Sequence, residues 1–158
     1  MANTQAMTTS FMGELMTATH NFGTAPTRGT SAADTFKAAL YLTSATVNAS
    51  TTAYSATNEV SGTGYTAGGV AVTNATPPTA TNSSATAGVA FFTPSASITY
   101  TTVTLTTAFD AVLIYNSTQS NKAVSVHTFG SQTITAGTFT LTMPSNTTTT
   151  ALLRLSTT

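Results

Sequence analysis

The sequence predicts a mainly β protein: an antiparallel β-sandwich or jelly-roll-like domain with one N-terminal α-helix. Threonine is the most abundant residue, and its β-branched side chain prefers the half-buried surface of a pleated sheet. Short runs of alternating apolar and polar residues recur along the second half of the chain, which is typical of a sandwich. Apolar residues at helical spacing stand out only near the N-terminus.

The predicted helix covers residues 7–22. Apolar side chains recur there at four-residue steps, with others one position on, so they form a single stripe. Gly23 follows the last apolar residue and is the predicted left-handed C-cap. A methionine-rich stripe can either fill a core or form an adaptable contact surface, and both alternatives stay open. We take its residues as candidate interface residues: Met7, Phe11, Met12, Leu15 and Met16.

Residues 1–23 are therefore predicted to be an arm and a helix, and residues 24–158 a single β-sandwich domain without internal repeats. The domain begins with a linker at 24–34, which is rich in Pro, Gly and Ser. A strand follows at 35–43, and its alternate apolar residues share one face: Phe36, Ala38, Leu40 and Leu42. Residues 44–58 are predicted to be a polar loop.

The later elements are short strands and loops. A strand over residues 69–74 ends before Pro77-Pro78, and residues 79–87 are predicted to be an exposed loop. Further strands are predicted at 88–93, 97–106, 110–116, 122–130, 138–143 and 151–156.

Two of these strands have unusual apolar patterns. The apolar residues of 97–106 switch from even to odd positions, which predicts a bulge or bend near Thr101-Thr102. The strand at 110–116 is apolar on both faces. This pattern is typical of a central strand that is covered on both sides.

The stretch EVSGTGYTAGGVAVTN contains Gly62-x-Gly64-x-x-Ala67, which matches the glycine pattern of dinucleotide-binding proteins. Such a site needs a strand before the glycines, a helix after them and an acid about 20 residues later. Here a β-type segment follows, and no acid occurs between Glu59 and Asp110. We therefore expect no nucleotide and no other cofactor. The glycines are assigned to a structural turn: Gly62, Gly64, Gly68 and Gly69.

Charge is scarce, at 5% of residues with a formal net charge of zero. The four cationic residues are scattered along the sequence: Arg28, Lys37, Lys122 and Arg154. They cannot form a patch that neutralises phosphates, which argues against nucleic acid and an anionic membrane surface as partners. The absence of cysteine excludes disulfides and thiolate metal sites. A neutral, hydroxyl-rich surface gives little protection against association, so it suits a protein that works within an assembly.

Few residues could support catalysis or bind a metal. His20 lies near the predicted C-terminal end of the helix, where a partly positive ring would interact favourably with the helix dipole. His127 is expected at a surface or interface. Asp110 begins a predicted strand and is expected to cap a turn. A triad would need these groups to converge, and a metal needs about three or four ligands, so we expect neither catalytic nor metal-binding residues. Arg154 is either an interface residue or an ordinary edge-strand charge.

Several segments in order resemble a family of small virion proteins of tailed bacteriophages: DTFKAALYLTSA, TNEVSGTGYTAGG, DAVLIYNST with NKAV, and the terminal ALLRLS. The resemblance covers most of the chain and is weakest over residues 75–97. It implies a non-enzymatic structural component of the particle and carries over no catalytic residues.

Within that family we expect a capsid cement (decoration) protein on the outer surface of the head, bound to the major capsid protein and to copies of itself as a homotrimer. The alternative is a tail-fibre, adaptor or receptor-binding component, for which exposed aromatic residues and acids would be expected. The five tyrosines are dispersed in the sequence, which favours the capsid. The N-terminus lacks a basic segment followed by an apolar run, so we expect synthesis in the host bacterial cytoplasm and a final location in the virion.

Overall fold

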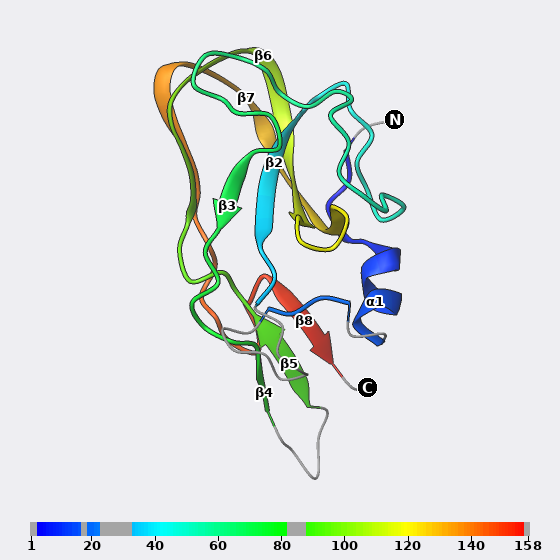
Figure 1. The fold of residues 1–158 in the computed structure, drawn as a ribbon. Coiled ribbons are helices and arrows are strands. Elements are labelled where there is room, and N and C mark those ends of the chain that lie inside the picture. The colour runs from blue at the N-terminus through cyan, green and yellow to red at the C-terminus, as the bar shows by residue number, and fades with distance from the viewer. Residues whose placement is uncertain (1–2, 17–18, 23–32, 82–87, 157–158) are drawn as a thin grey trace.

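The computed structural model describes residues 3–16, 19–22, 33–81 and 88–156, except for the side chains of Thr9, Met12, Gly13 and Met16. The protein is mainly β, with two antiparallel sheets in a β-sandwich-like arrangement (Figure 1). The mainly β, antiparallel part of the prediction is therefore confirmed.

The larger sheet has five strands in the order β1 (Ala6–Met7), β7 (Lys122–Leu141), β6 (Ile98–Asn116), β2 (Phe36–Leu42) and β3 (Val70–Val72). The smaller sheet has the order β4 (Thr79–Ala80), β5 (Val89–Phe92) and β8 (Leu153–Ser156). Helix α1 (Thr9–Met16) packs against β7 and lies to the side of β8 (Figure 1).

The long β6–β7 ribbon differs from the prediction of four separate strands over the same residues. The chain stays in strand conformation through several register shifts, and Figure 1 shows the ribbon arching over the top of the molecule. One shift falls between Tyr100 and Val103, and Thr102 has a φ of 53°. The predicted irregularity near Thr101-Thr102 is thus confirmed. A bulge absorbs the change of parity without ending the strand, which the alternation pattern could not indicate.

The central part of the larger sheet is buried on both faces. One face carries the predicted row of Phe36, Ala38 and Leu40, which pack with the ribbon residues Val112 and Ile114 in the main core. The other face is covered by the segment 44–58, whose buried members join a second cluster: Ala39, Tyr41, Ala45, Val47, Ala111, Leu113, Tyr115, Ala123 and Val126. The strand at 110–116 is therefore two-faced, because a loop packs over one side of it.

The N-terminal region is organised differently from the predicted helix 7–22. Helix α1 has eight residues, because Met7 pairs with Ser125 of β7 as part of β1 and residues 19–22 have no regular secondary structure. Strand pairing at one end thus overrides the helical periodicity. The predicted C-cap Gly23 and the linker up to residue 32 lie outside the described residues. Within the predicted loop 79–87, Thr79–Ala80 forms β4 and pairs with β5.

Candidate functional site

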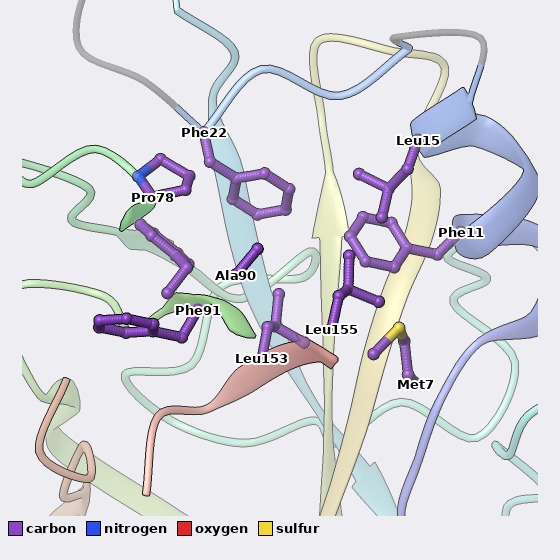
Figure 2. Close-up of a pocket in the computed structure, with 10 residues that line it drawn as sticks. Met7, Phe11, Leu15, Phe22, Pro78, Ala90, Phe91, Leu153 and Leu155 are labelled. Carbon is purple, nitrogen blue, oxygen red and sulfur yellow. The ribbon is translucent and has the colours of Figure 1, made fainter. Parts of the chain in front are cut away.

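An apolar pocket of about 100 Å³ lies between helix α1 and the smaller sheet (Figure 2). All the residues that line it are apolar: Met7, Phe11, Leu15, Phe22, Pro78, Ala90, Phe91, Phe92, Leu153 and Leu155. Figure 2 shows Phe11 and Leu15 descending from the helix and Leu153 and Leu155 rising from β8. Such a pocket can accept an apolar group through hydrophobic and dispersion contacts.

Stacked aromatic rings hold the wall of this pocket. Phe22 stacks on Phe36 of β2, with ring centroids 4.4 Å apart and planes 13° apart. Phe11 is only 2% exposed and contacts the edge of Phe22 at 5.8 Å. The wall is therefore continuous with the main core and is pre-formed.

The rim of the pocket is more accessible. Leu155 is 44% exposed, and it is the exposed large hydrophobic residue of the described chain. It shares the pocket-facing side of β8 with Leu153, whereas Arg154 points to the other side, as expected from the two-residue period of a strand. An exposed leucine beside an apolar pocket is a typical feature of a contact surface.

Polar contacts fasten helix α1 to the turn between β6 and β7. The Glu14 carboxylate lies 2.6 Å from His20 Nε2 and 2.5 Å from Lys122 Nζ. Asn116 Nδ2 lies 3.1 Å from His20 Nδ1 and donates to Asp34 Oδ2 at 2.7 Å. Partial burial by itself would raise the pKa of Glu14, but the hydrogen bonds and charges of Lys122 and His20 outweigh it and lower this pKa. Two of the four acids in the sequence, Glu14 and Asp34, thus belong to the polar cluster beside the helix.

Beside the apolar pocket, a polar groove of about 400 Å³ separates β8 from β1 and β7. Arg154 lines this groove, and its guanidinium donates to the carbonyl oxygen of Thr149 at 2.7 Å. His127 also lines it and lies 2.9 Å from Ser125 Oγ. The groove contains one charged side chain, and that side chain already stabilises a turn.

The structure thus brings together three of the candidate interface residues, Met7, Phe11 and Leu15. The side chains of Met12 and Met16 lie outside the described part, and Arg154 lies in the neighbouring groove. Seven further residues that line the apolar pocket were missed: Phe22, Pro78, Ala90, Phe91, Phe92, Leu153 and Leu155. The alternation in ALLRLS could have indicated the two leucines, and the position of Phe22, seven residues after Leu15 at the end of the predicted helix, could have indicated Phe22.

The four glycines lie where the loop between β2 and β3 runs closely along neighbouring strands. Added Cβ atoms would overlap backbone carbonyl oxygens: those of Thr104 at Gly62, Thr102 at Gly64 and Ala38 at Gly69. Gly64, Gly68 and Gly69 also have positive φ angles of 79°, 87° and 72°. At each of the four positions a residue with a Cβ would be strained by the overlap or by the positive φ, and at Gly64 and Gly69 by both. The glycines therefore determine the path of the loop.

The carboxylate of Glu59 holds the same loop from inside. It accepts hydrogen bonds from the hydroxyls of Tyr54 and Tyr65, at 2.6 and 2.8 Å, and from the backbone N–H of Gly68 at 2.7 Å. Burial and the hydrogen bonds to Glu59 raise the pKa of Tyr54 and of Tyr65. Glu59 is 9% exposed, so its three donors offset much of the cost of burying a carboxylate.

The remaining tyrosines surround this group. Tyr115 donates to the carbonyl oxygen of Gly68 and Tyr100 to that of Ala38, both at 2.7 Å. Tyr41 donates to Ser55 at 2.5 Å, and burial raises its pKa to about 12. The tyrosines are dispersed in the sequence but converge in space, which the sequence analysis missed. Tyr41, Tyr100 and Tyr115 are buried and Tyr54 and Tyr65 are half-buried, so none of the five is a fully exposed aromatic side chain.

The candidate catalytic groups do not converge. His20 is buried in the cluster below helix α1, beyond the end of the helix, and His127 is half-buried in the polar groove. The expectation of a surface or interface position for His127 stays a prediction, and its partial burial lowers its pKa to about 4. Asp110 lies within β6 and does not cap a turn; its Oδ1 accepts a hydrogen bond from Asn3 at 2.6 Å.

No group of three or more His, Cys, Asp or Glu side chains in the described residues could hold a metal ion. No helix in the described part is long and apolar enough to cross a membrane. Comparisons with family models, curated proteins and solved structures found no match to this chain. The pocket, groove and loop therefore have to be interpreted from the residues that form them. These residues provide apolar and polar contact surface, and among the described residues the candidate reactive groups are not assembled in one place.

Proposed function

We propose that the protein is a non-enzymatic structural component of a tailed-bacteriophage virion, and that it decorates and stabilises the outer surface of the capsid. The segment resemblance supports the type of particle. The exposed Leu155 at the rim of the apolar pocket supports a contact role, because three candidate interface residues line the same pocket. The partners are the major capsid protein and copies of the same chain, with three copies per assembly. The jelly-roll form of the domain belongs to this proposal too.

The near absence of charge supports a broad contact surface. Burying a charge on binding costs several kcal/mol unless it is well paired, and here few charges would have to be desolvated. Threonine and serine hydroxyls can bind backbone groups or water at the rim of an interface. Such a surface can gain contact area without a large electrostatic penalty.

The stabilising action follows from mass action. A protein that binds the assembled shell better than its free subunits lowers the free energy of the assembled state. Each contact can be weak, because many copies on one shell add their effects. This requires an accessible apolar anchor, and Leu155 with the adjoining pocket provides one.

Substituting the anchor tests the proposal. We expect Leu155→Asp to lower the occupancy of the protein on purified virions by at least about tenfold, because a carboxylate would have to be desolvated in an apolar contact. Thr57→Asp is the matched control, since Thr57 is exposed in the segment 44–58, away from the pocket lining. Full occupancy with Leu155→Asp would contradict the contact. Deleting residues 1–22 is a less selective test, because it removes the buried Phe11 and Phe22.

Copy number separates the capsid from the tail. A decoration protein follows the symmetry of the shell and is present in on the order of hundreds of copies per virion, whereas a fibre or adaptor is present in about three to eighteen. Quantitative mass spectrometry of purified virions measures this number. A low number would favour the tail-fibre, adaptor or receptor-binding alternative, and absence from virions would contradict both.

A further inference from the structure

One edge of the larger sheet is open over most of its length. Strand β7 pairs with β6 on one side, and on the other side β1 covers only Ser125 and Val126. Thr8 extends this cover with a backbone hydrogen bond to Val124 at 3.1 Å. Among the described residues, no strand pairs with the outer edge of β7 from His127 to Leu141. We call residues 128–141 the free edge.

The opposite side of the same ribbon is covered. Thr104 of β6 donates its backbone N–H to the carbonyl oxygen of Thr63 at 2.9 Å, and the glycine loop lies directly against this strand. The ribbon is therefore protected on its β6 side by the chain's own loop. Its β7 side presents unpaired backbone groups to the surroundings.

The free edge also lacks the features that normally prevent strands from pairing. Proteins protect open edges with charged side chains, prolines, short strands or bulges. Residues 123–141 contain no Asp, Glu, Lys, Arg or Pro. Strand β7 carries bulges at two places: one extra residue between Ile134 and Gly137, where Ala136 has a φ of 45°, and two extra residues between Thr128 and Gln132, so the edge is interrupted at both points. The short stretches 132–134 and 137–141 lie outside these bulges and can accept a partner strand.

We propose that the free edge pairs in antiparallel fashion with the free edge of a second copy of this chain. Two identical edges without charge place no like charges opposite each other, and without proline every residue keeps a backbone N–H, so both edges can donate and accept outside the bulges. Four apolar residues near the edge are only partly buried, and a second copy would cover them: Phe129, Ile134, Phe139 and Leu141. Pairing of like edges is two-fold symmetric and joins two five-stranded sheets into one.

The size of this contact predicts its strength. Fourteen residues at about 3.3 Å each would give an edge at most roughly 46 Å long, and a sheet is about 10 Å thick, so no more than about 450 Å² per copy would be buried. This is less than the ~800 Å² per partner of a stable complex, so the contact is expected to be reversible in solution. Holding copies side by side on a particle would strengthen it through effective concentration. Because it is two-fold symmetric, this contact is additional to the three-copy assembly of the proposed function and would link a chain to one in a neighbouring assembly; it rests on self-association alone and requires no capsid.

Cysteine cross-linking provides the direct test, because the natural chain has no cysteine. Thr133 and Thr135 are exposed and lie near the middle of the free edge, close to the expected two-fold axis. We expect Thr133→Cys or Thr135→Cys to form disulfide-linked dimers at least about tenfold faster than the loop control Thr57→Cys, under mild oxidation of the purified protein. Cross-linking no faster than the control would overturn the proposal.

Charge repulsion provides an independent test. Thr138→Lys combined with Thr140→Lys places charges on the edge, and both positions are exposed, so folding should be preserved. By sedimentation equilibrium we expect the wild type to form dimers with a Kd on the order of 10–100 μM. The Kd of the edge variant should be at least about tenfold weaker. The control variant, Thr52→Lys combined with Thr57→Lys, should have the same Kd as the wild type. A wild type that remains monomeric at ten times that concentration would overturn self-pairing and leave the edge to a different protein. Virion occupancy in the Leu155 experiment is measured separately, so the two proposals can fail independently.

Discussion

Replacing Gly69 by alanine tests the structural role of the glycine loop. An added Cβ would overlap the carbonyl oxygen of Ala38 and lie 2.8 Å from the Cα of Ala39, both in the backbone of the buried strand β2. The φ of Gly69 is 72°, a conformation that a residue with a Cβ rarely adopts. The substitution therefore combines conformational strain with a clash that no side-chain movement can relieve.

The magnitude follows from these two contributions. A non-glycine residue in the left-handed region costs about 1–2 kcal/mol, and forcing extra volume against a packed backbone costs typically 1–3 kcal/mol. We expect Gly69→Ala to lower the free energy of unfolding by about 3–5 kcal/mol. Moving the loop would also lengthen the hydrogen bond from Gly68 N–H to Glu59, which is 2.7 Å in the intact protein.

Equilibrium unfolding in urea, followed by circular dichroism, measures this loss. Gly130→Ala is the matched control, because its Cβ would meet nothing within 4 Å, and we expect a change of less than about 1 kcal/mol. Gly68→Ala should fall between the two, since its φ is 87° but the nearest atom to an added Cβ is the Tyr115 hydroxyl at 3.1 Å. If Gly69→Ala were as stable as Gly130→Ala, the loop would not lie against β2, and the structural explanation of the glycines would be refuted.

Two further predictions concern pH. Because burial raises the pKa of Tyr41 to about 12, the contribution of its protonated hydroxyl to stability should be complete below pH 10 and be lost as pH rises through 12. The absorbance of tyrosinate should therefore rise together with unfolding. Titration of Tyr41 near pH 10 in the folded protein would contradict this. Burial lowers the pKa of His127 to about 4, so the fold favours the neutral ring and should lose up to about 3 kcal/mol as pH falls from 6.5 to 4. In urea titrations at a series of pH values, His127→Gln should reduce the loss of unfolding free energy between pH 6.5 and 4. If the variant loses as much stability as the wild type over this range, other groups are responsible.

The sequence predicted those parts of the fold that depend on local pattern. The alternation in 35–43 correctly placed Phe36, Ala38 and Leu40 on one core face, and the parity switch near Thr101-Thr102 correctly indicated an irregular strand. Patterns could not show that strands separated by a few polar residues would continue as one ribbon. Strand continuity depends on pairing with a partner, and that partner is distant in the sequence.

The candidate site was predicted only in part for the same reason. Helical spacing identified Phe11 and Leu15, but the pocket also needs Phe22, which lies beyond helix α1, and the leucines of β8, which are remote along the chain. The boundaries of the helix were wrong because Met7 gains more from pairing with β7 than from one more helical turn.

Composition and local order by themselves determined that this chain forms β-structure, carries almost no charge and uses its glycines for conformation, because each of these depends on single residues or their immediate neighbours. Only the tertiary structure decided that five dispersed tyrosines meet around Glu59, that an exposed leucine borders an apolar pocket, and that β7 has an uncovered edge. These features arise from contacts between residues far apart in the chain. Their free energies depend on packing and pairing geometry, which the linear sequence does not contain.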